Sequence, residues 1–219
     1  MPFRNRTDAG RQLAAALLPY RDRKPVVLAL PRGGVPVAAE IAAALDAPLD
    51  LVIVRKIGLP HDPEFAMGAV VDGPEPLTVR NLGVIAGSGV GEQAFAQVRD
   101  RELAEIERRR ARYLGRRAHP DIAGRTAIVV DDGVATGATT RAALLAVRAR
   151  GPERIVLAVP VAPPDALETL RGEADDIVCL ETHADFGAIG YYYRDFDQVP
   201  DDEVVRLLAQ HPVRDGDST

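Results

Sequence analysis

The sequence predicts an α/β fold with a central, mainly parallel sheet flanked by helices. Five short apolar runs are rich in Val and Ile and show little alternation of apolar and polar residues, which is typical of strands covered on both faces. Segments with helical spacing lie between these runs, as expected where helices connect parallel strands. The expected strands are residues 26–30, 51–54, 127–130, 155–161 and 177–180.

Recognisable end signals bound several of the expected helices. Thr7 or Asp8 is a suitable cap for a helix that ends near residue 18. Gly151 and Pro152 stop a helix predicted over 139–150. Two further helices are predicted, an alanine-rich one over 35–45 and a short one over 165–171.

A long, charged helix is predicted over residues 91–113, inside an insert at about 82–124. It carries Arg108, Arg109 and Arg110 close to several glutamates. Glutamates three or four residues from arginines favour a solvated face with acid–base pairs. A subunit contact or support for a lid is the open alternative, because the sequence does not fix the role of this insert.

Composition bounds the class of protein. The 219 residues are 47% hydrophobic, which is enough for the core of one domain spanning 1–219. The formal net charge of -5 disfavours a nucleic-acid or acidic membrane surface. The one cysteine, Cys179, excludes an internal disulfide, and no run has signal-peptide or membrane-spanning character. We therefore expect a cytoplasmic protein that binds neither nucleic acid nor membrane.

The turn after the expected strand 127–130 has the composition of an anion site. Asp131 and Asp132 stand at the carboxyl end of the strand, and small or hydroxylated residues lead into the next helix. Such a turn can direct backbone N–H groups at one phosphate, helped by the helix N-terminus, while the two carboxylates can accept hydrogen bonds from ribose hydroxyls. The residues of the turn after the acids are Gly133, Val134, Ala135, Thr136, Gly137, Ala138 and Thr139.

Other interpretations of glycine-rich segments are weaker. An ordinary strand-to-helix turn with a threonine cap remains open for residues 131–139. No G-x-x-x-x-G-K-[ST] motif occurs, so a Walker-type phosphate site is not supported. The stretch 87–91 lacks dinucleotide-loop spacing, because Glu92 stands where the third glycine is needed, and we expect a flexible loop there.

The apolar run, the two acids and the Thr-Gly-x-Thr loop together resemble the signature of the type I phosphoribosyltransferase family. The similarity extends over most of the chain. Arg32, Gly33 and Gly34 stand where that family has its pyrophosphate loop, and Arg55 and Lys56 stand where its mobile catalytic loop begins. The resemblance implies a Rossmann-like sheet with a helical insert and a small C-terminal hood.

The resemblance also implies a reaction. A Mg2+-dependent transferase of nucleotide salvage would move the 5-phosphoribosyl group of phosphoribosyl pyrophosphate to a nitrogenous acceptor, a nucleobase, and release pyrophosphate. Arg55, Lys56, Asp131 and Asp132 would be catalytic. The turn 131–139 and the residues Arg32, Gly33 and Gly34 would bind the substrate. Mg2+ would bind mainly through the substrate, near the two acids, with no direct protein ligand assigned.

The aromatic segment 183–200 occupies the position of the family's hood, which covers the acceptor. Its residues Phe186, Tyr191, Tyr192 and Tyr193 are implied acceptor ligands, because aromatic faces can stack on a planar base. The alternative, that these rings close the edge of the core, stays open. The role of His61, next to the basic pair, is not fixed by the sequence.

The residue at position 135 limits which class of acceptor we expect. Hypoxanthine-guanine enzymes of the family carry an aspartate where this chain has Ala135, so the loop resembles adenine- and uracil-type enzymes more closely, although the insert and the hood match neither. The acceptor is not identified. A non-catalytic sensor of phosphoribosyl pyrophosphate or a nucleotide is the main alternative, and a hydrolase using Asp131 is a weaker one. A homodimer is common in the family, but the sequence does not establish it.

Overall fold

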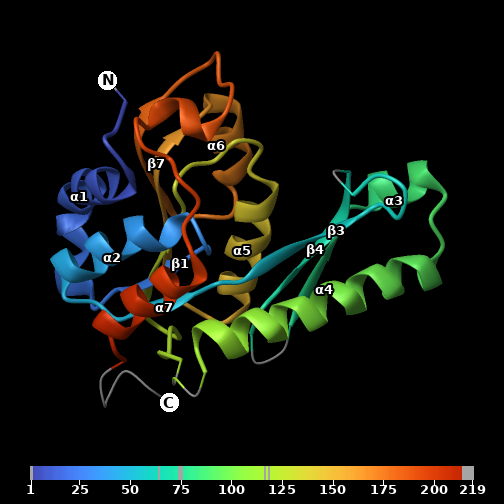
Figure 1. Ribbon diagram of the computed structural model, residues 1–219, viewed down its shortest axis with the longest axis horizontal. Helices are drawn as coiled ribbons and strands as arrows, with labels where there is room; N and C mark the ends of the chain where they lie inside the picture. The colour runs from blue at the N-terminus through green and yellow to red at the C-terminus, as the bar shows by residue number, and fades with distance from the viewer. Residues whose placement is uncertain (1, 64, 74–75, 116, 118, 214–219) are drawn as a thin grey trace.

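The protein consists of a parallel five-stranded sheet with helices on both faces and a second, antiparallel sheet that projects from it (Figure 1). This computed structural model describes residues 2–63, 65–73, 76–115, 117 and 119–213, so positions 116 and 118 of the expected insert lie outside the described residues. The strand order in the large sheet is β2-β1-β6-β7-β8, and every neighbouring pair is parallel. The predicted α/β fold with a central parallel sheet is confirmed.

Each strand of the large sheet carries a buried apolar run. Its strands are β1 (Val26–Ala29), β2 (Leu49–Leu51), β6 (Thr126–Val130), β7 (Arg154–Ala162) and β8 (Asp176–Thr182). The helices beside it are α1 (Arg6–Leu17), α2 (Gly34–Leu45), α5 (Ala138–Ala149), α6 (Pro164–Leu170) and α7 (Asp201–Gln210), with the short 3-10 segments η1 (Leu18–Arg23) and η2 (Ile189–Tyr192).

Alternation along the strands divides the core into two layers. Val27 and Ile128 face α1 and α2, whereas Leu28 and Val129 face α5 and α6. Both layers are apolar, and this is why the runs show no alternation in the sequence.

One predicted strand, 51–54, is wrong in its bounds and its sheet. The large-sheet strand β2 ends at Leu51, and Val54 begins β3 (Val54–Gly58), which pairs antiparallel with β4 (Ala66–Val71). The chain changes sheets at Val52 and Ile53, and both are buried. Because the apolar run continues through this bend, the sequence does not reveal it. Arg55 and Lys56 consequently lie within a strand, not in a loop.

Residues 54–113 form an arm that extends from the sheet (Figure 1). It contains β3, β4, β5 (Leu77–Arg80), α3 (Leu82–Ser88) and the long helix α4 (Glu92–Tyr113). Helix α4 confirms the predicted charged helix and packs against β3, β4 and α7. No helix in the described ranges has the length and apolar character needed to cross a membrane.

The N-terminal helix begins earlier than predicted. Its cap is Asn5, whose Oδ1 accepts from the backbone N of Asp8 at 2.9 Å. Neither Thr7 nor Asp8 is the cap, because both lie inside the helix. The shift matters for the site, because it brings Arg6 to the start of α1, where its side chain reaches the carboxyl edge of the sheet.

Candidate functional site

Two turns meet at the carboxyl edge of the large sheet. The Arg-Gly turn (residues 31–34) follows β1, and the Asp-Thr turn (residues 131–139) follows its neighbour β6. The backbone N of Leu30 donates to the carbonyl oxygen of Val130 at 2.9 Å, which joins the two turns at their base. The peptide bond between Pro31 and Arg32 is cis.

The close contact between the Arg-Gly turn and the Asp-Thr turn requires glycine at positions 33 and 34. A methyl group at Gly33 would lie 2.0 Å from Oδ2 of Asp132, and one at Gly34 would lie 2.7 Å from the carbonyl oxygen of Val130. Real Cβ atoms do not approach other atoms so closely, so a side chain at Gly34 would push the turns apart, and one at Gly33 would displace the carboxylate of Asp132. The structure therefore brings together Arg32, Gly33, Gly34 and the two acids, as the sequence predicted.

The two adjacent carboxylates have different surroundings. Asp132 is buried, and its Oδ2 accepts from Nε of Arg6 at 2.7 Å. Asp131 is half-buried and caps its neighbour, because its Oδ1 accepts from the backbone N of Asp132. Burial, followed by the negative charge of Asp132, raises the pKa of Asp131 well above its ordinary value. Asp131 is thus the acid of the pair with no cation in direct contact among the described residues.

The Asp-Thr turn ends at the N-terminus of α5. Gly137 has φ 78°, a left-handed conformation that favours glycine, and it leads into Ala138, the first residue of the helix. The backbone N of Val134 donates to the carbonyl oxygen of Val161, which ties the turn to β7. Ala135, Thr136 and Ala138 are exposed, so the helix N-terminus is open to an anion.

A cavity of about 520 Å³ separates the Asp-Thr turn from the arm. Thr136, Gly137 and Thr139 line one wall, and Lys56 lines the other. Arg80 and Arg141 add positive charge to the same cavity. The predicted basic residue Lys56 thus shares a cavity with the predicted anion turn.

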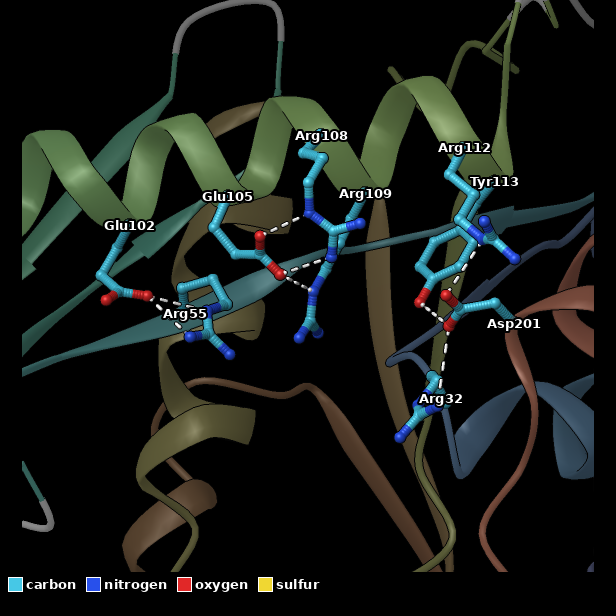
Figure 2. A network of polar contacts seen from close by, with 9 residues as sticks. All are labelled: Arg32, Arg55, Glu102, Glu105, Arg108, Arg109, Arg112, Tyr113 and Asp201. Carbon is cyan, nitrogen blue, oxygen red and sulfur yellow. Dashed lines mark hydrogen bonds and ion pairs between the residues drawn. The ribbon is translucent and has the colours of Figure 1, made fainter.

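Arg55 lies on the opposite face of β3, because side chains alternate along a strand. Its Nε donates to Oε2 of Glu102 in α4 at 2.8 Å, and Glu102 is buried. Lys56 therefore lines the cavity, whereas Arg55 is bound to α4. Figure 2 shows the contact between Arg55 and Glu102.

The family model for the phosphoribosyl transferase domain matches residues 4–195 of this chain, from the start of α1 to the hood. The chain belongs to this family. Among the described residues of this phosphoribosyl transferase domain, no cluster of three His, Cys, Asp or Glu side chains is arranged to hold a metal ion.

Two kinds of relatives agree with the family. A Mycobacterium tuberculosis protein, named provisionally as a phosphoribosyl transferase, is 47% identical over 206 residues, in two strains. That alignment covers 94% of this chain and 46% of the relative, so the chain spans about half the length of the curated relatives it matches. The crystal structure of TT1426 from Thermus thermophilus is 43% identical, with a TM-score of 0.83, and the match covers 97% of this chain and all of that one.

The aromatic segment 183–200 packs against the Asp-Thr turn. The buried Tyr193 donates its hydroxyl to the carbonyl oxygen of Asp132 at 2.6 Å, and Ile189 lies against Gly133. Tyr192 stacks between His183 and Phe186.

Tyr191 differs from the other predicted acceptor ligands. Its side chain is 77% exposed, so of the four predicted rings it is the one open to solvent. The acceptor role of all four stays a prediction. The buried position and backbone contact of Tyr193 agree with the alternative that its ring closes the edge of the core.

Three charged residues that hold the site were not found from the sequence. Arg6 binds Asp132, and its guanidinium lies over the ring of Phe196 with 3.8 Å between Cζ and the ring centroid. Glu102 binds Arg55. Asp201 accepts from the Tyr113 hydroxyl at 2.7 Å and pairs with Arg32 at 3.6 Å. No local sequence signal marks these residues, because each contact joins distant parts of the chain.

Proposed function

We propose that this chain is a Mg2+-dependent phosphoribosyltransferase that moves the 5-phosphoribosyl group of phosphoribosyl pyrophosphate to a nitrogenous acceptor. The observation that carries the proposal is the contact between the Arg-Gly turn and the Asp-Thr turn, with Lys56 across the cavity. These parts can bind the three anionic or hydroxylated regions of one ligand: a monoester phosphate, a ribose and a diphosphate.

Each part has a role in this proposal. The backbone N–H groups of Ala135–Thr139 and the N-terminus of α5 hold the 5′-phosphate, with Lys56 facing them. Asp131 and Asp132 accept hydrogen bonds from the ribose hydroxyls. Arg32, with the backbone of Gly33 and Gly34, binds the diphosphate.

With the phosphate, the ribose and the diphosphate of the substrate bound in this way, the proposed reaction is a displacement at the anomeric carbon. The bond between the anomeric carbon and the diphosphate oxygen breaks, and its electron pair leaves with pyrophosphate. A lone pair on the acceptor nitrogen forms the new bond to the same carbon. Positive charge develops on the ribose, and in this proposal the carboxylates of Asp131 and Asp132 stabilise it.

The donor set suits Mg2+, which prefers oxygen ligands and keeps several waters. Asp131 is the candidate of the two acids, because it carries no direct cation partner in the described part of the chain. When bound, Mg2+ would neutralise the charge of the diphosphate. Asp132 is already paired with Arg6 and serves to position the turn.

The acceptor is assigned to the hood. Tyr191 offers an exposed ring, and the Tyr192–Phe186 pair offers a stacked one. Ala135 supplies a methyl group where a general base would otherwise stand, so acceptors that need deprotonation at that point are disfavoured. A nucleobase of the adenine or uracil type fits this environment best, which would place the chain in cytoplasmic nucleotide salvage.

The test is release of pyrophosphate from phosphoribosyl pyrophosphate in the presence of Mg2+ and a panel of bases. We expect turnover with at least one base, and loss of ribose binding in the double variant Asp131→Asn/Asp132→Asn, measured by calorimetry. Normal affinity in the double variant would remove the role given to the two acids. Tight binding by the wild type without turnover on any base would instead favour a sensor of phosphoribosyl pyrophosphate.

A further inference from the structure

One face of α4 brings unexpected positive charge to the edge of the candidate site. Figure 2 shows a polar network formed by this face together with Arg55, Arg32 and Asp201. The network contains five arginines and three carboxylates, an excess of two positive charges, although the whole chain has a net charge of -5. Such a local excess is typical of a surface that binds an anion.

Arg109 has unused hydrogen-bond donors in this network. Its Nε donates to Oε1 of Glu105 at 2.8 Å, and its two terminal nitrogens have no contact with other described residues. Figure 2 shows its guanidinium directed away from the helix, between Arg55 and Arg32. The side chain is 25% exposed, so it is accessible yet held in one orientation.

The carboxylate that orients Arg109 is itself fixed. Glu105 also accepts two hydrogen bonds from Arg108, at 2.7 and 2.9 Å. The hydrogen bonds from Arg108 and Arg109 lower the pKa of Glu105 to about 2, so it stays ionised at any physiological pH. A charged, doubly anchored carboxylate restricts the Arg109 side chain, which lowers the entropy that ligand binding would cost.

Arg109 also lies near the Arg-Gly turn. Tyr113 is one helical turn further along α4, about 6 Å by the rise of a helix, and bonds to the same Asp201 that pairs with Arg32. Burial and the Asp201 hydrogen bond raise the pKa of Tyr113, while the charges of Arg109 and Arg32 oppose that rise. Both arginines therefore act on the same hydroxyl group.

Helix α4 is secured at this point. Arg112 pairs with Asp201 at 3.0 Å, and Ile106 and Tyr113 are buried. The position of Arg109 relative to Arg32 is thus set by packing and by the Asp201 contacts, not by a free side chain.

We propose that Arg109 of α4 binds the diphosphate of the substrate, as a second cation beside Arg32. This assignment rests on the proposed function, since it names the same ligand. It gives the charged insert a direct part in the site. The guanidinium offers two free terminal nitrogens in a plane, which match two oxygens of a phosphate group.

The experiment compares ligands that differ only in the diphosphate. The affinities of phosphoribosyl pyrophosphate, inorganic pyrophosphate and ribose 5-phosphate are measured by titration calorimetry for the wild type, Arg109→Ala and Arg109→Lys. We expect Arg109→Ala to lower the affinity for phosphoribosyl pyrophosphate and for inorganic pyrophosphate by about tenfold or more, because one charge-assisted pair is lost. The affinity for ribose 5-phosphate should not change. Arg109→Lys should recover part of the loss.

Arg99→Ala is the matched control, since Arg99 lies on the same helix and pairs with its chain neighbour Asp100 at 2.7 Å. It should bind all three ligands like the wild type. Equal loss of all three ligands in Arg109→Ala would mean that the helix had moved, and unchanged affinity for both diphosphates would overturn the proposal. The proposed function can fail while the Arg109 proposal holds. That result would be pyrophosphate binding that depends on Arg109, with no release of pyrophosphate from phosphoribosyl pyrophosphate by the wild type.

Discussion

The carboxyl edge of the large sheet and the arm hold their charged residues by different means. At the edge, two turns pack closely: a side chain at Gly34 would meet the backbone of Val130, and one at Gly33 would meet the carboxylate of Asp132. In the arm, cations are placed by ion pairs with carboxylates on another element, as Glu102 holds Arg55. The first arrangement depends on shape and the second on charge.

The difference predicts how each region tolerates change. A shape-dependent contact fails when a single methyl group is added, because packed backbone cannot move away. A charge-dependent contact at a partly exposed position loses less, because water replaces part of the lost interaction. Variants of the two regions should therefore separate by magnitude.

The largest effect is expected for Gly33→Ala. The added methyl group would lie 2.0 Å from Oδ2 of Asp132, so the carboxylate must leave its ion pair with Arg6 or the turns must separate. We expect a loss of unfolding free energy of about 3 kcal/mol, the upper part of the range for overpacking, together with loss of ligand binding. Denaturant unfolding measures the first quantity. Gly172→Ala is the control, because no atom lies within 4 Å of a methyl group there. Equal stability of the two variants would show that the turns are not packed as described.

Asp132→Asn should have the next largest effect. The carboxylate and Arg6 are both nearly buried, with side chains 11% and 12% exposed, and the substitution leaves the arginine charge without its partner. Arg6 keeps its hydrogen bond to the carbonyl oxygen of Asp197, so we expect a loss of about 2 kcal/mol, less than for a fully buried pair. Asp8→Asn is the comparison, since it breaks an ion pair to Arg4, whose side chain is 71% exposed. If both variants lose the same amount of stability, burial of the Arg6 pair does not matter.

Shape-dependent parts of the site were also the parts that the sequence predicted. The acids, the glycines and the helix start follow one another within nine residues, and local chemistry fixes their conformation. Two such segments after neighbouring parallel strands must meet at one edge. The contact between Gly33 and Asp132 follows from that topology.

Charge-dependent contacts could not be predicted in this way. Arg6 and Asp132 are 126 residues apart, and Arg55 and Glu102 are 47 apart. Many arginines and acids in the chain could form such pairs, so composition does not select among them. The antiparallel sheet of the arm was missed for a related reason, because the apolar run through Val52 and Ile53 hides the change from one sheet to the other.

Within the arm, Glu102→Gln tests how far charge alone places Arg55. The amide keeps the shape and one acceptor but removes the negative charge that faces the guanidinium at 2.8 Å. We expect a loss of about 1 kcal/mol, since the Arg55 side chain is 34% exposed. Glu92→Gln is the matched control at the far end of α4, where the carboxylate is 68% exposed and pairs with Arg80. A loss above that of Asp132→Asn would mean that the arm is held as tightly as the sheet edge.

The smallest effect, and one of opposite sign, is expected for Asp131→Asn. Burial and the charge of Asp132 raise the pKa of Asp131 in the folded state, so the folded chain binds this proton more tightly than the unfolded chain does. Stability therefore falls as the pH rises from the unfolded pKa through the folded one, and the ionised acid is a cost at neutral pH.

The asparagine keeps Oδ1 as acceptor for the backbone N of Asp132 and removes the charge, so it should raise the melting temperature at pH 8. The gain should vanish at pH values below the unfolded pKa, where the carboxyl is protonated in both states. A gain that is the same at both pH values would come from something other than ionisation. The substitution breaks no ion pair and keeps the hydrogen bond from the backbone N of Asp132, so the gain should be smaller than any of the losses above. A variant that is more stable yet binds ribose less well would show that the edge retains a destabilising carboxylate for its function.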